Sequence, residues 1–193
     1  MRYLVDCLAY SSKFLDEIGV RYWLDCASLL GFYRDNRIIP WDKDVDFSIM
    51  SSDAPRILEH YQKIIDDEYY PMYRLHKETY PKNDFPFKGG KIEVVKFFVS
   101  QKNRLHADMY CHDECDGKIS RLNPNWPCNS FSSDFVKDLK TVDFHGVKVY
   151  IPRETKAYLT LLYGEDFMEY PSHRIQDMKR FEQIKDVYAS RNL

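Results

Sequence analysis

The strongest constraint on the fold of this chain is a short segment in which acidic and apolar residues alternate. The segment from Asp42 to Ile49 reads Asp-Lys-Asp-Val-Asp-Phe-Ser-Ile, with aspartates at positions 42, 44 and 46. Because successive side chains of a β-strand point to opposite faces, an extended segment places the three aspartates on one face. Val45, Phe47 and Ile49 then point into a hydrophobic core on the other face.

The three aspartates predict a site for a divalent metal ion. Carboxylates held this close repel one another and are costly to bury without compensation. A divalent cation removes that cost, and ligands that are all oxygen atoms favour a hard ion, Mg²⁺ or Mn²⁺. We expect Asp44 and Asp46 to be the ligands, whereas the turn at Pro40-Trp41 can rotate Asp42 away. On the dipeptide pattern alone, an exposed strand with solvated acids is the alternative.

The segment upstream of these acids is typical of a phosphate-binding turn. Residues 20–25 predict a strand rich in aromatic and β-branched residues, which follows Gly19. The small residues Ala27 and Ser28 then predict a tight turn that opens a short helix running through Arg34. Such a turn offers free backbone N–H groups to phosphate oxygens, and the carboxylates would hold the metal ion that bridges those phosphates.

These residues resemble the signature of the LicD family, which contains bacterial phosphocholine transferases and the eukaryotic fukutin and fukutin-related protein. The first block is residues 22–34, Tyr-Trp-Leu-Asp-Cys-Ala-Ser-Leu-Leu-Gly-Phe-Tyr-Arg, followed by residues 38–46, Ile-Ile-Pro-Trp-Asp-Lys-Asp-Val-Asp. Residues 105–110 resemble the strand that supplies the third acid of the family, Asp108 in this chain. Residues 151–173 resemble the C-terminal block of the family.

The resemblance implies an α+β fold of the nucleotidyltransferase type, with a mixed β-sheet flanked by helices in one domain over residues 1–193. It also implies that Asp44, Asp46 and Asp108 are the catalytic residues and the ligands of Mg²⁺ or Mn²⁺. Asp108 is then a candidate to accept the proton of the acceptor hydroxyl, directly or through the metal ion.

We expect Ser28, Gly31 and Arg34 to bind the substrate. The hydroxyl of Ser28 can donate a hydrogen bond to a phosphate oxygen. Arg34 lies about one helical turn beyond Gly31, where a guanidinium can pair with phosphate. A salt bridge from Arg34 to one of the strand acids is the equally weighted alternative.

The family resemblance implies a metal-dependent phosphotransferase. Its substrate would be a CDP-linked donor, from which a phospho-alcohol (phosphocholine or a phospho-alditol, as in CDP-ribitol) moves to a glycan hydroxyl. A nucleotidyltransferase that moves a nucleotide monophosphate to a small substrate would use the same acids. A non-catalytic member of the family is the third possibility, because Ala27 stands where the family usually has glycine. The family also favours glycine just before the 38–46 run, where this chain has Asn36-Arg37, and Asn tolerates the left-handed region.

Composition and charge narrow the remaining choices. There are 28 Lys and Arg against 30 Asp and Glu, so nothing marks the chain as a nucleic-acid binder. No apolar run approaches the ~20 residues of a transmembrane helix, and Asp6 interrupts the N-terminal apolar residues, which argues against a signal peptide. A complete chain of this kind would be cytoplasmic, whereas a piece of a membrane-anchored parent would lie in the Golgi lumen.

Five cysteines, an odd number, do not form a closed set of disulfides. Cys111 and Cys115 flank His112, and a zinc site with Cys128 and a histidine (His112 or His106) is one reading. Ordinary thiols in a loop are the reading we favour, because the spacing matches no established zinc module.

The rest of the chain predicts alternating helices and strands of one domain. We expect helices at 2–18, 54–65, 152–164 and 174–190, strands at 69–75, 92–99 and 105–111, a hairpin at 142–151, and loops at 81–90 and 123–133.

Overall fold

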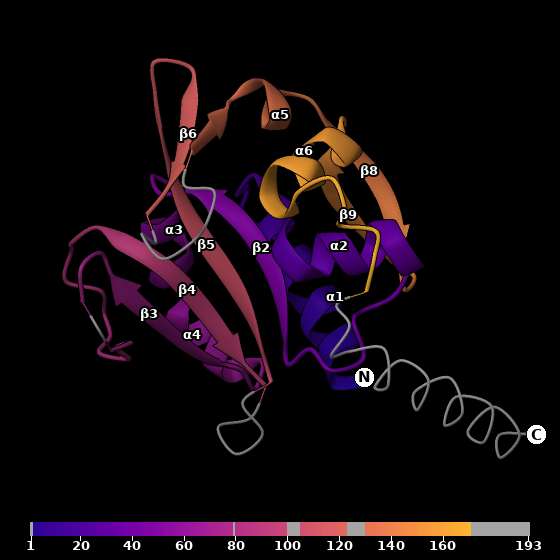
Figure 1. Ribbon diagram of the computed structural model, residues 1–193. Helices are drawn as coiled ribbons and strands as arrows, with labels where there is room; N and C mark the ends of the chain where they lie inside the picture. The colour runs from indigo at the N-terminus through magenta and orange to yellow at the C-terminus, as the bar shows by residue number, and fades with distance from the viewer. Residues whose placement is uncertain (1, 79, 100–104, 123–129, 171–193) are drawn as a thin grey trace, which may run out of the picture.

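The computed structural model describes residues 2–78, 80–99, 105–122 and 130–170, which form helices and strands in alternation (Figure 1). The helices are α1 (Arg2–Glu17), α2 (Cys26–Asp35), α3 (Ala54–Glu59), α4 (Tyr61–Asp66), α5 (Asp134–Lys137) and α6 (Thr155–Tyr163). The strands are β1 (Tyr22–Leu24), β2 (Asp44–Met50), β3 (Tyr70–Leu75), β4 (Ile92–Phe98), β5 (His106–Cys115), β6 (Lys118–Arg121), β7 (Ser130–Ser132), β8 (Leu139–Phe144) and β9 (Val147–Pro152).

The main sheet is mixed and curled. Its central strands run in the order β1-β2-β5-β4-β3, and β6 and β7 extend it beyond β5. Strands β2 and β5 are parallel, and the other pairs are antiparallel. A separate two-stranded sheet is formed by β8 and β9, which turn at His145-Gly146. A parallel pair needs a crossover connection, and here α3, α4 and the β3-β4 hairpin supply it between β2 and β5.

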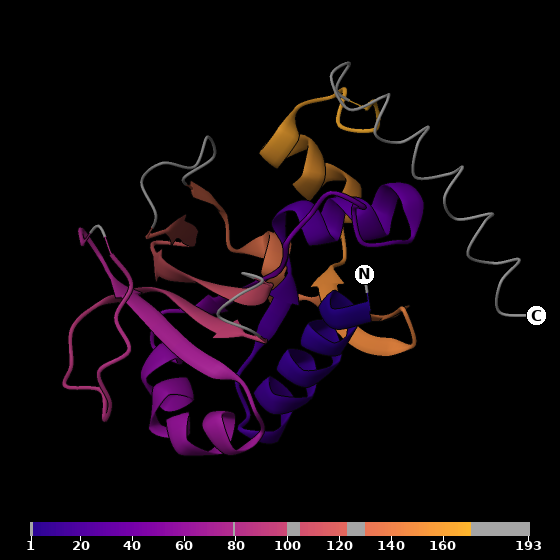
Figure 2. The ribbon, with the colours of Figure 1, turned by 90° about the horizontal axis from the view of Figure 1, so that it is seen from below.

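The alternating pattern of β2 separates the core from the site. Val45, Phe47 and Ile49 are fully buried on the face that α1 covers, whereas the even-numbered residues of β2 point to the other face. Helix α3 packs on β4 and α4 packs on β3, so the same face of the sheet continues under these helices. Figure 2 shows α1, α3 and α4 below the sheet and α2 with α6 above it. The aspartates therefore project into the space between the sheet and α2.

Helix α2 has well-defined ends. Asp25 is its N-cap residue, and the Asp25 carboxylate accepts a hydrogen bond of 2.8 Å from the backbone N–H of Cys26. Asn36 ends the helix in the left-handed conformation, with φ of 50°. This confirms the expectation that Asn36 supports a turn before the acidic strand, since asparagine is one of the few residues that adopt this conformation readily.

The predicted fold class is confirmed, because the chain is an α+β protein with a mixed sheet flanked by helices. Several local predictions differ from the structure, among them the strand expected over 105–111, which as β5 continues to Cys115. The helix expected over 54–65 is two short helices that meet at His60, and β7 lies within the loop expected over 123–133. Pro152 ends β9, and the helix expected to begin there starts at Thr155. The last expected helix, 174–190, lies outside the described residues, so one domain over 1–193 stays a prediction.

Within the described part of the chain, none of the helices combines the length and the apolar character needed to cross a membrane.

Candidate active site

The predicted catalytic acids lie on the two parallel strands at the centre of the sheet. In the register of β2 and β5, Asp44 is opposite His106 and Asp46 is opposite Asp108. Residues that are opposite one another in a sheet point to the same face, so all four side chains face α2. Asp46 and Asp108 are buried, whereas Asp44 is partly exposed. Asp44, Asp46 and Asp108 therefore lie on two adjacent strands of the mixed sheet.

The acids form two overlapping sets rather than one triad. In the first set, ligand atoms of Asp42, Asp44 and Asp46 lie within 4.8 Å of one another. In the second set, ligand atoms of Asp44, His106 and Asp108 do the same. Asp44 belongs to both sets, while Asp46 and Asp108 belong to different ones. Asp42 precedes β2, yet its carboxylate still reaches the cluster, contrary to the expectation that the turn at Pro40-Trp41 turns it away.

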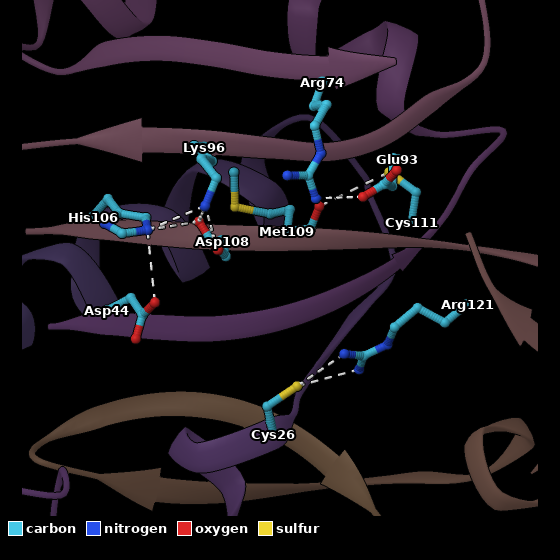
Figure 3. Close-up of polar contacts among 10 residues, drawn as sticks. All are labelled: Cys26, Asp44, Arg74, Glu93, Lys96, His106, Asp108, Met109, Cys111 and Arg121. Carbon is cyan, nitrogen blue, oxygen red and sulfur yellow. Dashed lines mark hydrogen bonds and ion pairs between the residues drawn. The ribbon is translucent and has the colours of Figure 1, made fainter. Parts of the chain in front are cut away.

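Lys96 on β4 contacts the second set directly (Figure 3). Its Nζ donates to both carboxylate oxygens of Asp108, at 2.7 and 2.6 Å, and lies 3.2 Å from Nε2 of His106. Nε2 of His106 in turn lies 3.1 Å from Oδ1 of Asp108 and 3.6 Å from Oδ2 of Asp44. Both carboxylate oxygens of Asp108 thus accept a hydrogen bond from Lys96, and the role of Asp108 as acceptor of the hydroxyl proton stays a prediction.

The charges of the cluster shift the pKa values of its members in opposite directions. Burial, together with the negative charges of Asp44, Asp42 and Asp108, raises the pKa of Asp46 well above its usual range. Burial and a hydrogen bond with the Asp44 carboxyl raise the pKa of Asp42 to about 7. Asp108 is also buried, but His106 and Lys96 outweigh that effect and lower its pKa.

The first set fits a hard divalent cation. Mg²⁺ and Ca²⁺ bind oxygen ligands at about 2.0–2.6 Å, so two ligands of one ion lie no more than about 5 Å apart. The carboxylate oxygens of Asp42, Asp44 and Asp46 meet that limit. Burial and neighbouring carboxyl groups raise the pKa values of Asp42 and Asp46, so a bound cation would relieve an unfavourable concentration of negative charge. The chemistry of this donor set therefore suits Mg²⁺ or Mn²⁺.

Two of the predicted substrate-binding residues support the backbone around the cluster. The hydroxyl of Ser28 is buried and accepts a hydrogen bond of 2.9 Å from the backbone N–H of Asp46. A Cβ at Gly31 would lie 2.5 Å from the carbonyl oxygen of Arg37, so the close approach of that loop requires glycine. Both residues thus hold the structure that positions the acids, and their contact with a substrate stays a prediction.

Among the described residues, Arg34 contacts Asp35 and Tyr170, and not one of the strand acids with which the sequence suggested a salt bridge. Its Nε donates to Oδ2 of Asp35 at 3.0 Å, and its guanidinium lies 4.0 Å from the centre of the Tyr170 ring. The side chain is 5% exposed. Pairing of Arg34 with phosphate stays a prediction.

The backbone conformation that favours glycine falls on Cys26 rather than on Ala27. Cys26 has φ of 49°, whereas Ala27 is not among the described residues with positive φ and lies within α2. The absence of glycine at position 27 therefore imposes no backbone strain on this turn.

Sequence reasoning missed a buried polar network beside the acids. Arg121 on β6 donates to Oδ2 of Asp25 at 2.7 Å and to Sγ of Cys26 at 3.2 Å, and Tyr158 donates to Oδ1 of Asp25 at 3.1 Å. The Asp25 and Arg121 side chains are 0% and 2% exposed. The backbone N–H of Asp25 also donates to the carbonyl oxygen of Asp46, at 3.0 Å. The network thereby fixes the start of α2 against the acidic strand.

The structure does not place Cys111 and Cys115 in one zinc site. Both lie on strand β5 rather than in the expected loop, four residues apart, a separation of about 13 Å at ~3.3 Å per residue. Cys111 is buried and Cys115 is exposed. Neither is in a metal-binding group among the described residues. Cys128, the third cysteine of that reading, lies outside the described residues.

A mixed sheet with aspartates on neighbouring central strands, beside the start of a short helix, defines a domain of the nucleotidyltransferase type. Comparison with protein families identifies the group within this class. Residues 19–154 match the family described as "LicD/FKTN/FKRP, nucleotidyltransferase domain", and the chain belongs to this family. The match confirms the resemblance seen in the sequence.

The curated relatives are considerably longer than this chain. "Ribitol 5-phosphate transferase FKRP" of Mus musculus is 26% identical over 181 residues, which are 90% of this chain and 33% of the relative. "Ribitol-5-phosphate transferase FKTN" of Mus musculus is 29% identical over 164 residues, 83% of this chain and 32% of the relative. The chain thus spans about a third of the length of these relatives.

A solved structure resembles this chain over most of the length of both chains. The "lincosamide antibiotic adenylyltransferase LnuA, lincomycin-bound" matches with a TM-score of 0.49 and 17% sequence identity, over 93% of this chain and 96% of that chain.

Proposed function

We propose that this chain is a transferase of phosphorus-containing groups that moves a phospho-alditol from a CDP-activated donor to a glycan hydroxyl, with a divalent metal ion. The observation that carries the proposal is the cluster of Asp44, Asp46 and Asp108 on strands β2 and β5 of a LicD-family domain, together with Asp42 just before β2. Ribitol 5-phosphate is the preferred cargo, because relatives that cover most of the chain are named as transferases of this group.

The proposed reaction is a displacement at the β-phosphorus of the donor. The acceptor hydroxyl forms a new oxygen–phosphorus bond, and the bond between that phosphorus and the oxygen bridging to the α-phosphate breaks. Cytidine monophosphate leaves with the bonding electron pair, and the proton of the hydroxyl passes to a base. Phosphoryl transfer of this kind depends mainly on positioning and on electrostatic stabilisation.

The residues of the cluster would divide these tasks. Asp42, Asp44 and Asp46 would hold the metal ion, which neutralises charge on the phosphate and makes a bound hydroxyl more acidic. Asp108, anchored by Lys96 and His106, would complete the carboxylate set. In the metal-free protein Asp42 is partly exposed and has a pKa of about 7, so binding of the metal ion near neutral pH would displace a proton from this carboxyl.

The test is a product analysis with purified protein. CDP-ribitol and CDP-choline are each supplied with Mg²⁺ and a glycan acceptor, and the nucleotide product and the mass of the acceptor are followed. We expect release of cytidine monophosphate and a gain of ribitol phosphate on the acceptor, both abolished by a chelator. Asp46→Asn serves as the inactive control. Asp66→Asn, which removes one charge on α4 away from the cluster, serves as the active control.

Other products would overturn the proposal in distinct ways. Transfer from CDP-choline alone would retain the reaction type and change the cargo to phosphocholine. Release of pyrophosphate from CTP, with the nucleotide on the acceptor, would show a nucleotidyltransferase. Transfer that survives the chelator would remove the metal ion from the mechanism.

A further inference from the structure

Lys96 is a charged residue within a largely buried strand. Strand β4 reads Ile-Glu-Val-Val-Lys-Phe-Phe, and it is buried at most of its positions. Lys96 lies in the interior of this strand with its side chain 19% exposed. A lysine in such a place requires a partner, because an unpaired ammonium group is costly to bury. The register supplies that partner, since Lys96 is directly opposite Asp108 on β5.

The ammonium group of Lys96 lies where an ion would have to lie to use the second set of ligands. It contacts both carboxylate oxygens of Asp108, and it is 3.2 Å from the Nε2 atom of His106 (Figure 3). A metal ion held by Asp44, His106 and Asp108 would need these same atoms. It would also bring two positive charges into contact with the ammonium group.

The first set is differently arranged. Asp42, Asp44 and Asp46 come from one continuous segment, and Lys96 makes no hydrogen bond or ion pair with any of them among the contacts recorded for the described residues. Asp108, by contrast, lies within ion-pair distance of both Lys96 and His106. One half of the cluster therefore lacks a cation, and the other half already has one.

We propose that Lys96 is a built-in cation that takes the place of a second metal ion, so that this site works with one divalent ion at Asp42, Asp44 and Asp46. The inference rests on the proposed function and deepens it. Lys96 fixes the charge of Asp108 without occupying Asp44, which leaves Asp44 free to serve the single ion. Neutralising Lys96 opens the Asp44–His106–Asp108 set to a second ion.

The test counts bound ions rather than turnover. Mn²⁺ alone is titrated into the purified protein, and free Mn²⁺ is followed by electron paramagnetic resonance. We expect one tightly bound Mn²⁺ per chain in the wild type and two in Lys96→Gln. Lys96→Arg, which keeps the charge, should bind one. A double variant, Lys96→Gln with His106→Ala, should return to one, because it removes a ligand of the second set.

The matched control is Lys91→Gln. Lys91 directly precedes β4, pairs with Asp113 and is 51% exposed, so this variant makes the same change in charge away from the cluster. It should bind one Mn²⁺, which separates the local effect of Lys96 from a general change in net charge. Circular dichroism of each variant checks that the fold is retained.

Two bound ions in the wild type would overturn the inference whether or not any variant folds, and would leave the proposed transfer intact, since that is scored by cytidine monophosphate release. A single ion in a folded Lys96→Gln protein would also overturn it. Absence of bound Mn²⁺ in all the proteins would overturn both this inference and the metal requirement of the proposed function.

Discussion

The hydroxyl oxygen of Ser28 accepts a hydrogen bond of 2.9 Å from the backbone N–H of Asp46. Ser28 lies in the first turn of α2 and Asp46 lies on β2, and both residues are buried. This bond spans the seam between helix and strand. It fixes the position of Asp46 relative to α2. The turn at Ala27-Ser28 is therefore joined to the carboxylate cluster by a hydrogen bond within the protein rather than through a bound substrate.

Replacement of Ser28 with alanine should lower both stability and activity. The N–H of Asp46 would be buried without a partner, which costs about 1–3 kcal/mol. Urea unfolding of the metal-free protein measures this loss, and the transfer assay measures the effect on rate. Ser132→Ala, at an exposed position on β7, should change the free energy of unfolding by less than about 0.5 kcal/mol. Equal stability of Ser28→Ala and wild type would show that the bond contributes nothing.

The role of Ser28 shows what a sequence pattern can and cannot assign. The pattern of small residues and a hydroxyl before a helix predicted the turn, and the structure has a helix start there. The same pattern did not reveal that the hydroxyl is directed at Asp46 rather than outward. That direction depends on the packing of α2 on β2, which only the three-dimensional structure supplies.

Replacement of Asp46 with asparagine should abolish most activity while the fold is retained. The amide keeps the shape but removes one charge from the proposed metal ligands, and we expect at least a ~100-fold loss of rate, comparable to the loss of one electrostatic stabiliser. In a chelator the variant should be at least as stable as wild type, because the buried carboxylate is repelled by Asp44, Asp42 and Asp108. Near-full activity of the folded variant would remove Asp46 from the catalytic set.

The metal-free protein should lose stability from Asp42 as the pH rises from about 4 to about 7. The pKa of Asp42 is raised from 3.8 to about 7 in the folded protein, so the folded state binds the proton more tightly than the unfolded state. That contribution is fully present below the unfolded pKa and is lost as the pH rises through the folded pKa. Bound Mg²⁺ should reverse the trend, because it stabilises the ionised carboxylates.

The measurement is urea unfolding at pH 5 and pH 8 in a chelator, for wild type and Asp42→Asn. His112 has a pKa lowered from 6.5 to about 3 by burial and Arg121, so its contribution favours the folded state increasingly as the pH rises from about 3 to about 6.5 and is constant above that. This opposite trend is common to both proteins, so their difference reports Asp42 together with its effect on the pKa of Asp46. Identical pH dependence of the two proteins would contradict the prediction.

Long alternating segments were predictable, whereas single polar residues inside apolar strands were not assigned. The acids at 44 and 46 and the strand with Asp108 follow from periodicity and from the family resemblance. Lys96 had a signal, a lone lysine in the apolar run of β4, but its partner depends on the register of β4 and β5. Arg121 had none, since its contact with Asp25 joins residues 96 positions apart in the sequence.

Replacement of Arg121 with methionine should destabilise the protein more than any surface substitution. The guanidinium is the buried cation opposite Asp25, and its loss leaves a buried carboxylate unpaired, at a cost of about 3–5 kcal/mol. Because Asp25 caps α2 and its N–H binds the carbonyl of Asp46, part of this cost should be seen as loss of activity before global unfolding.

The matched control for Arg121→Met is Arg153→Ala. Arg153 also pairs with an aspartate, Asp138, but the two side chains are 57% and 65% exposed, so solvent screens the pair and it should contribute little to stability. Adding Asp25→Asn to Arg121→Met should recover part of the lost stability, because it removes the unpaired charge. Urea unfolding measures the free energy of unfolding of the wild type, Arg121→Met, Arg121→Met with Asp25→Asn, and Arg153→Ala. A loss of stability in Arg121→Met no larger than that in the surface control would show that the buried pair does not hold α2 against the acidic strand.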